Sequence, residues 1–364
     1  MQSRRPHGTR PHRRRLCAHA QCGRYRIHRP QAVTRPDSTV VVSVALCTFR
    51  GEPYLAAQLD SILAQTRPPQ ELVVFDDASP DGTWALLESF APRVRAAGIQ
   101  LVMHRNAANV GYVANFEQAL RSTTGDIVFL CDQDDLWHPT KVEHFTAEFE
   151  RRPDLLMLHS DARLVDSQGE SMDCSLFEAF EVTREELTAV HAGDMFEVLL
   201  RRNIVTGATM AVRRAVFAGD FTVPEGWIHD EWLAMVATSK GRVDCLELHS
   251  IDYRQHGNNQ IGARRRGFVE RLTGGGMSRL EFMTRTLLRT QTLLDLAEVG
   301  RLKLGASEMQ LLRDRLTHAR FRATPPHRIH ERLLAILREY ASGRYSRFSN
   351  GPRSAVSDLL LLRK

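Results

Sequence analysis

The stretch that decides the fold runs from Gly125 to Trp137 and has the sequence Gly-Asp-Ile-Val-Phe-Leu-Cys-Asp-Gln-Asp-Asp-Leu-Trp. Its apolar part, 127–131, is short, rich in β-branched and aromatic residues and bounded by polar ones, which predicts a strand buried on both faces. Three carboxylates follow at once, on Asp132, Asp134 and Asp135. Because open α/β sheets bind ligands beyond the carboxyl ends of their strands, we expect these acids at the edge of a site.

These three carboxylates have two interpretations. So close together they repel one another unless a cation lies among them, and their oxygen ligands suit a hard divalent metal such as Mg²⁺ or Mn²⁺. The alternative is that they only form a turn and cap the helix expected to begin near Pro139.

The pattern of strand, polar loop and helix also occurs three times before this stretch. The apolar runs end at residues 47, 75 and 104, and the polar residues that follow them include Thr48, Glu52, Asp76, Asp77, Arg105 and Gly111. Each of these can face a ligand or belong to a simple connection; Asp76 and Asp77 suit a base or ribose hydroxyl, and Arg105 suits a phosphate. The alternation over 40–150 predicts a mostly parallel, doubly wound sheet with polar residues on one edge.

The periodicity changes after residue 150. Residues 155–161 are expected to form a further strand, and the polar segment 166–190 is expected to be a loop or lid. Residues 203–212 are predicted to be a strand broken by Gly207, which suggests a bulge or a close ligand contact. After the strand expected at 243–248, the segment 253–260 is polar and rich in hydrogen-bond donors.

Two further groups of residues have both a structural and a functional interpretation. Asp230 and Glu231 lie between Trp227 and Trp232, where an acid favours a helix start but where a carboxylate beside indole rings also suits a sugar pocket with a general base. Arg254 and His256 follow the next strand, and they suit either structural contacts or a diphosphate and its metal.

The net charge of +6 is misleading, because residues 1–36 contain ten arginines and no acid, which leaves 39 basic against 43 acidic residues elsewhere. The folded part is therefore not basic, which argues against nucleic-acid binding. Residues 1–38 are expected to be disordered, and no apolar run is long enough to cross a bilayer. The six cysteines show no CxxC spacing, which is typical of reduced thiols in a cytoplasmic protein.

The C-terminal part, from about residue 277 to 340, has the periodicity of amphipathic helices with arginines on the polar side. Such helices either pack on the domain or lie on an acidic membrane surface, which would place the protein at the inner face of the plasma membrane. We therefore expect three parts: a tail at 1–38, an α/β domain at 39–265 and a helical extension at 266–364.

Taken together, several motifs resemble the family 2 glycosyltransferases of the GT-A fold. The motifs are Ser43 to Phe49, Phe75 to Ser79, Asn109 to Phe116, Asp132 to Asp135, and His229 to Trp232. The Asp-Gln-Asp-Asp form, with Tyr253 to Asn259 downstream, is most similar to the bacterial rhamnosyltransferases. The resemblance covers about 38–262, and it implies a nucleotide-sugar donor, a divalent cation, Mg²⁺ or Mn²⁺, and inversion at the anomeric carbon.

The resemblance also implies roles for particular residues. The donor would be held by Thr48, Glu52, Asp76, Asp77, Arg105, Gly111, Asn115, Asp132 and Arg254. The metal would be held by Asp132, Asp134 or Asp135, with His256 as a further ligand, and Asp230 would deprotonate the acceptor hydroxyl. The family motif has no residue between this aspartate and the tryptophan, whereas Glu231 is inserted here, so both acids stay candidates for the base.

The implied function is transfer of a sugar, L-rhamnose from dTDP-rhamnose, to a hydroxyl of a glycan or lipid-linked acceptor in cell-surface polysaccharide synthesis. The alternatives are a UDP-hexose donor or a non-catalytic sugar-binding scaffold. A phosphatase of the haloacid dehalogenase type also carries an Asp-x-Asp after a strand, but after its first strand, whereas three strand-helix units precede it here. No GxGxxG or P-loop motif supports a dinucleotide or NTPase site.

Overall fold

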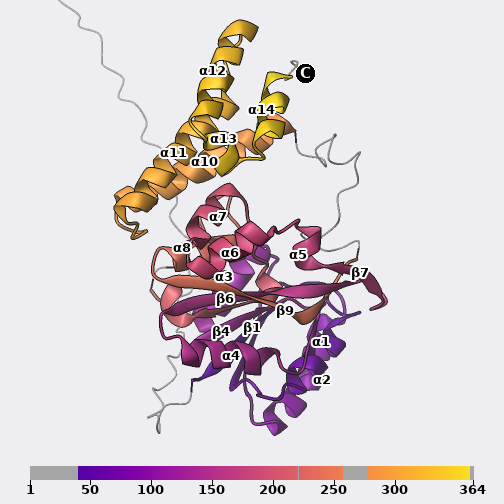
Figure 1. Ribbon diagram of the computed structural model, residues 1–364. Helices are drawn as coiled ribbons and strands as arrows, with labels where there is room; N and C mark the ends of the chain where they lie inside the picture. Colours follow the sequence, from indigo (N-terminus) through magenta and orange to yellow (C-terminus); the bar gives the residue numbers. More distant parts are fainter. Residues whose placement is uncertain (1–39, 220, 257–277, 361–364) are drawn as a thin grey trace, which may run out of the picture. The chain divides into compact units, whose positions relative to one another are not determined.

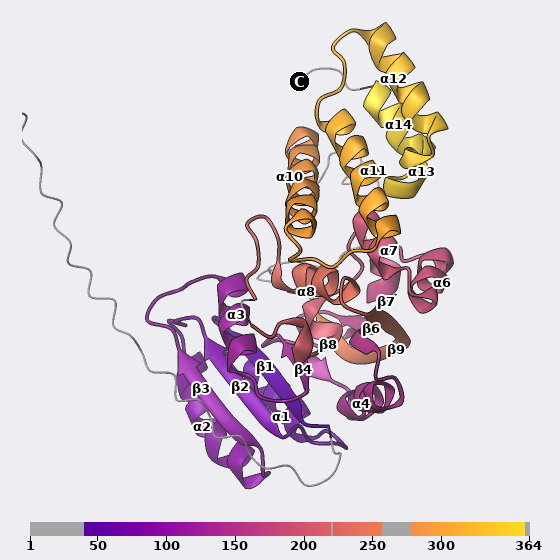
Figure 2. The same cartoon turned by 90° about the vertical axis from the view of Figure 1, so that its left-hand side faces the viewer.

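The computed structural model describes residues 40–219, 221–256 and 278–360, in which nine strands form one mixed sheet flanked by helices. The predicted tail at 1–38, the polar residues 257–260 and the proposed boundary near 265 lie outside the described residues, as do the last four residues, 361–364. Figures 1 and 2 show the sheet in two views at right angles.

The first half of the sheet is the predicted series of strand-helix units. Its elements are β1 (Val42–Thr48), α1 (Leu55–Leu63), β2 (Glu71–Asp76), α2 (Thr83–Ala96), β3 (Gln100–Arg105), α3 (Tyr112–Ser122) and β4 (Ile127–Cys131). Strand β1 pairs in parallel with both β2 and β4, and β2 pairs in parallel with β3. The prediction of a parallel sheet over this region, made from the alternating pattern, is confirmed.

The second half of the sheet is mixed. Its elements are β5 (Leu136–Trp137), α4 (Lys141–Arg151), β6 (Leu155–Val165), β7 (Ser171–Ser175), α5 (Leu176–Ala179), α6 (Arg184–Ala192), α7 (Met195–Arg201), the 3₁₀ helix η1 (Gly207–Thr209), β8 (Met210–Arg213), the 3₁₀ helix η2 (Arg214–Val216), α8 (His229–Thr238) and β9 (Arg242–Arg254). The strand order is β3-β2-β1-β4-β8-β6-β9-β5, with β7 on β6. Strand β8 is antiparallel to β4 and to β6, whereas β9 runs parallel to β6.

Both faces of the sheet are covered, because successive side chains of a strand point to opposite sides. In β1, Val44 and Leu46 belong to a core with residues of α1, α2 and α4, whereas Ala45 and Cys47 belong to a core with residues of α3, α7 and α8. All seven residues of β1 are buried, as expected of a central strand with helices on both sides.

Two of the expected elements are wrong. The segment 166–190 is not simply a loop, because it contains β7, α5 and most of α6. Both helices begin with a capping box, Ser175 with Glu178 and Thr183 with Glu186. This Ser/Thr-x-x-Glu spacing is visible in the sequence and predicts helix starts.

The predicted strand 203–212 is the other wrong element. Residues Gly207–Thr209 form η1, in which the amide of Thr209 donates to the carbonyl of Thr206, and only Met210–Arg213 pair as β8. The segment before β8 is therefore a loop that turns toward α8.

The predicted helical C-terminal part is confirmed by α10 (Arg279–Glu298), α11 (Ala306–Ala323), α12 (Ile329–Ala341), α13 (Arg344–Phe348) and α14 (Pro352–Leu359). Leu293 of α10 and Leu312 of α11 belong to the same core as α7 and α8, so these two helices pack on the α/β part. None of the described helices combines the length and apolar character that a bilayer crossing requires.

Candidate active site

A cavity of ≈ 590 Å³ lies at the carboxyl ends of β1, β2 and β4. The strand register explains why, because Thr48 at the end of β1 pairs with Asp76 at the end of β2, and Leu46 pairs with Cys131 at the end of β4. Eight of the predicted site residues line this cavity: Thr48, Asp77, Gly111, Asn115, Asp132, Asp134, Asp230 and His256. The volume is within the range of roughly 300–1,000 Å³ typical of small-molecule sites.

Five predicted site residues lie outside this lining: Glu52, Asp76, Arg105, Asp135 and Arg254. The Glu52 carboxylate accepts the amide of Gly82 at 2.9 Å, just before α2. Asp76 is fully buried and accepts the Thr48 hydroxyl at 2.9 Å, and Arg105 donates to the carbonyl of Ser79 at 2.6 Å. These contacts hold the loops around the cavity, and a nucleotide-binding role for these residues stays a prediction.

Asp77 lines the cavity, but its carboxylate oxygens already accept hydrogen bonds from residues of the neighbouring loop. Its Oδ1 accepts the Asn106 side-chain amide at 2.9 Å and the amide of Val110 at 2.8 Å, while Oδ2 accepts the amide of Gly111 at 2.9 Å. Gly111 has a φ of 86°, a conformation that glycine adopts without the steric cost of a side chain. The carboxylate therefore anchors the turn into α3.

The acids after β4 lie close together, with Asp135 buried and Asp132 and Asp134 half-buried. Burial, followed by the carboxylates of Asp134 and Asp230, raises the pKa of Asp132 to about 8, whereas the Lys141 ammonium opposes this rise. Burial, followed by the carboxylates of Asp134 and Asp132, also raises the pKa of Asp135 well above its usual range. A cation among these oxygens would offset the repulsion between them.

The other members of this group come from β9, which lies far away in the sequence. The backbone amide of Arg254 donates to Asp135 Oδ1 at 3.0 Å, and the Arg254 side chain donates to the carbonyl of Asp134 at 3.0 Å. His256 Nε2 lies 2.8 Å from Asp134 Oδ2, and the imidazole stacks on Tyr54 with ring centroids 4.8 Å apart. The structure thus brings together the two predicted halves of the metal and diphosphate site.

The chemistry of this group fits a divalent cation. Its ligands are carboxylate oxygens and one imidazole, and Asp135 Oδ2 is buried with no hydrogen-bond partner among the described residues. Among the described residues, however, no three of the ligand atoms of Asp132, Asp134, Asp135 and His256 all lie within 4.8 Å of one another. Side-chain rotation would be needed for them to meet on one ion.

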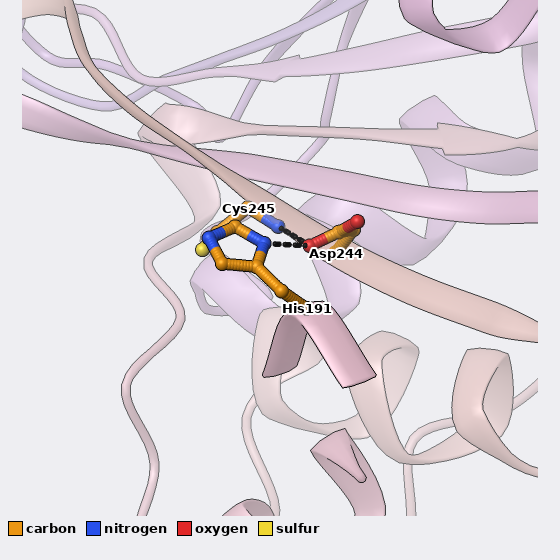
Figure 3. Close-up of side chains that lie close together, drawn as sticks. All are labelled: His191, Asp244 and Cys245. Atoms are coloured by element: carbon orange, nitrogen blue, oxygen red, sulfur yellow. Dashed lines mark hydrogen bonds and ion pairs between the residues drawn. The ribbon is translucent and has the colours of Figure 1, made fainter. Parts of the chain in front are cut away.

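The set that does converge within 4.8 Å is His191, Asp244 and Cys245, which Figure 3 shows between α6 and β9. Asp244 Oδ1 lies 2.7 Å from His191 Nδ1, and its Oδ2 lies 2.6 Å from the Arg152 guanidinium. Burial, followed by the charge of Asp244, raises the pKa of the Cys245 thiol to about 12. A carboxylate already paired with arginine and a protonated thiol are poor metal ligands, so this cluster links α6 to β9.

Asp230 also lines the cavity, from the first turn of α8. Its Oδ2 accepts the amide of Gly207 at 2.9 Å, and its Oδ1 accepts the amide of Glu231 at 2.7 Å. Burial raises the pKa of this carboxyl, while the two amides and the Arg289 guanidinium lower it. A fixed carboxylate with a raised pKa is the arrangement that a general base requires.

Glu231 also lines the cavity, but its carboxylate is paired. Arg289 of α10 donates to Glu231 Oε2, and the guanidinium carbon lies 3.9 Å from the centre of the Trp227 ring. Among the residues that the structure describes, no arginine or lysine forms such an ion pair with Asp230. The geometry thus favours Asp230 over Glu231 as the base, although their roles stay predictions.

Sequence reasoning gave no role to several residues of this site. Gln133 bridges two strand ends, because it accepts the amide of Phe49 at 2.7 Å and donates to the carbonyl of Phe49 at 2.8 Å. Lys141 is buried beneath the acids, donates to the carbonyl of Ala208 at 2.7 Å, and has a pKa lowered by burial to about 7. A lysine in the first turn of a helix after the acids was the only sequence signal.

Residues 43–217 match Glycosyl transferase family 2. The chain is 27% identical over 246 residues to YwdF of Bacillus subtilis, an uncharacterized glycosyltransferase, covering 64% of this chain and 82% of that one. It is 26% identical over 248 residues to the uncharacterized protein Rv1520 of Mycobacterium tuberculosis, covering 66% and 67%.

The fold is also that of solved glycosyltransferase structures. TarS 1–349 of S. aureus, in complex with UDP-GlcNAc, is 17% identical with a TM-score of 0.54, covering 87% of this chain and 83% of that one. The mannosyltransferase PcManGT of Pyrobaculum calidifontis, in complex with GDP-Man and Mn²⁺, is 18% identical with a TM-score of 0.50, covering 90% and 84%. The predicted GT-A-type fold is confirmed, and the protein is a glycosyltransferase in which residues 43–217 match Glycosyl transferase family 2.

Proposed function

We propose that the protein moves a sugar from a nucleotide-sugar donor to a hydroxyl of a glycan or lipid-linked acceptor, with inversion at the anomeric carbon. The observation that carries this proposal is the Asp230 carboxylate, fixed by two backbone amides in the same cavity as Asp132 and Asp134. The cavity would hold the donor, and Asp230 would supply a base for the acceptor.

The proposed reaction is a single displacement. The acceptor oxygen attacks the anomeric carbon as its proton passes to a carboxylate oxygen of Asp230, and the bond from that carbon to the diphosphate oxygen breaks with its electron pair. Asp132, Asp134, Asp135 and His256 would hold a divalent cation, Mg²⁺ or Mn²⁺. When bound, this ion would offset the negative charge that grows on the leaving nucleoside diphosphate.

The first donor to test is dTDP-L-rhamnose, because the Asp-Gln-Asp-Asp motif resembles the rhamnosyltransferases. The second is a UDP-hexose or UDP-N-acetylhexosamine, which the likeness to the TarS complex with UDP-GlcNAc favours. GDP-mannose is the third, because PcManGT was solved with GDP-Man and Mn²⁺. A role in cell-surface polysaccharide synthesis follows from the same resemblance.

A panel of these nucleotide sugars, offered with Mg²⁺ or with Mn²⁺, tests the proposal by binding and by release of nucleoside diphosphate. We expect one donor to bind and to be turned over when an acceptor is present. Binding of a UDP-sugar but not of dTDP-rhamnose would reject L-rhamnose as the donor sugar, while the protein would remain a glycosyltransferase. Binding without turnover over a broad acceptor panel would instead favour the sugar-binding scaffold.

We also propose that the C-terminal helices touch an anionic membrane at the cytoplasmic face. Ile329, Leu333 and Leu337 are exposed on α12 at intervals of four residues, so they share one side of the helix. Arg328 and Arg338 are exposed nearby. Apolar side chains flanked by arginines suit the interface of anionic lipids.

Cosedimentation with phosphatidylglycerol vesicles, compared with phosphatidylcholine vesicles, tests this proposal. The double variant Leu333→Glu/Leu337→Glu should lose binding to the anionic vesicles, whereas Val299→Glu, at an exposed position after α10, should keep it. Equal sedimentation of the wild type and the double variant would reject the membrane role.

A further inference from the structure

His229 is the residue before the candidate base, and the mechanism above does not use it. It begins α8, lines the cavity and is only 6% exposed. Its imidazole stacks on Phe116, with ring centroids 4.0 Å apart and an interplanar angle of 13°, and it meets the edge of Tyr112 at 6.0 Å. The aromatic contacts fix the ring in one orientation.

Neither ring nitrogen of His229 has a hydrogen-bond partner among the described residues. Burial lowers the pKa of this imidazole to about 3, so the ring is neutral at physiological pH. A neutral imidazole carries one N–H donor and one acceptor nitrogen. Leaving such groups buried and unpaired is unfavourable, and a ligand that hydrogen-bonds them would remove this cost.

The Nε2 edge of the ring lies close to Gly207. A Cβ atom added to Gly207 would lie 3.2 Å from His229 Nε2 and 3.5 Å from the Cβ of Asp230. Gly207 and Thr206 line the same cavity as His229, so the Nε2 edge lies beside a stretch of the cavity wall. The unpaired nitrogen and the Asp230 carboxylate are thus held side by side.

We propose that His229 binds a sugar hydroxyl through its neutral ring and so helps to determine which sugar the enzyme accepts. A hydroxyl both donates and accepts a hydrogen bond, which matches a neutral imidazole, whereas a phosphate would favour a cation. This inference rests on the proposed glycosyl transfer. The hydroxyl belongs either to the donor sugar or to the acceptor, and the two sources are separable by experiment.

The variants for the test are His229→Phe, which keeps an aromatic ring and removes both nitrogens, and His229→Gln, which restores a donor and an acceptor. The matched control is His159→Phe. His159 is fully buried in β6, neither of its nitrogens has a partner among the described residues, and its ring meets Phe177 at 5.8 Å, but it does not line the cavity.

The donor arm measures binding of the nucleotide sugar that the wild type turns over, with the free nucleoside diphosphate as reference. The acceptor arm measures the acceptor KM at saturating donor. We expect His229→Phe to weaken one of the two by about tenfold, the loss of roughly one neutral hydrogen bond. Binding of the nucleoside diphosphate should be unchanged, His229→Gln should recover part of the loss, and His159→Phe should match the wild type in both arms.

Wild-type constants for His229→Phe in both arms would overturn the inference while leaving glycosyl transfer intact. A loss shared equally by His159→Phe would overturn it as well, because the effect would then come from the fold. If His229→Phe does not fold, the imidazole NMR signal of His229 in the wild type decides, and a signal that moves on neither donor nor acceptor titration rejects a contact. A wild type that binds no nucleotide sugar rejects the proposed function itself.

Discussion

Replacing Asp230 by asparagine is the sharpest test of the proposed chemistry. The substitution keeps the size of the side chain but removes the base, and positioned proton transfer contributes about 10²–10⁴-fold to rate. We therefore expect kcat/KM to fall by that factor, which corresponds to about 3–5.5 kcal/mol of transition-state stabilisation. Initial rates of nucleoside diphosphate release at saturating metal measure it.

The structure also limits what Asp230→Asn does to stability. The carboxylate accepts two backbone amides, from Gly207 and Glu231, and an asparagine has only one oxygen for them. The lost hydrogen bond costs about 1–3 kcal/mol, but the variant no longer buries a carboxylate whose pKa burial has raised, so the two effects partly cancel. A fold still intact by thermal unfolding then shows that the lost rate is chemical.

The control for this experiment is Glu231→Gln, which changes the neighbouring acid of the same helix. Because Glu231 is paired with Arg289, we expect its variant to lose no more than about tenfold, the effect of one weakened hydrogen bond. Wild-type kcat/KM should rise with pH through an apparent pKa above the usual aspartate range, and Asp230→Asn should remove this rise. Near-normal activity of Asp230→Asn, or a larger loss in Glu231→Gln, would refute the assignment.

Three further predictions follow from the charges in and around the cavity. The Arg289→Met variant should move the acidic limb of the pH profile to higher pH, because the guanidinium lowers the pKa of both Glu231 and Asp230; a profile that does not move would show that Arg289 only packs. His159 has a pKa lowered by burial to about 4, so its neutral form favours the native state above pH 6.5, and this contribution of up to about 3 kcal/mol is lost as pH falls from 6.5 to 4. Urea unfolding of His159→Phe should therefore depend less steeply on pH in that window, and an unchanged slope contradicts the argument. Mn²⁺ at about 100 times its Kd should raise the free energy of unfolding by about 2.7 kcal/mol, EDTA should reverse this, and Asp134→Asn should abolish it; an equal thermal shift in Asp134→Asn would place the ion elsewhere.

The sequence determined the first half of the fold because that information is local. Strands bounded by glycine and acids, each followed by a helix, are specified by short runs of residues, and parallel pairing then gathers their polar ends at one edge. Thr48, Asp77, Asp132 and Asp134 were predicted in this way, and they do line one cavity. The same local logic, applied to the Ser175 and Thr183 capping boxes, would also have found the helices missed within 166–190.

Only the tertiary structure decided which hydrogen-bond or ion-pair partner each polar group has. The sequence places Asp76 and Asp77 beside the site, but contacts with Thr48, Asn106 and the loop before α3 show that both carboxylates are already held by the protein. The distinction between Asp230 and Glu231 likewise depends on Arg289, which is 58 residues away from Glu231 in the chain.

The neutral state of His229 was also decided by tertiary packing, because it depends on the burial of the ring, which stacks on Phe116. Sequence patterns report which face of an element is apolar. Hydrogen-bond partners, burial and pKa values arise from contacts between distant segments, so they were fixed only when β1, β2, β4, η1, α8 and β9 met around the cavity.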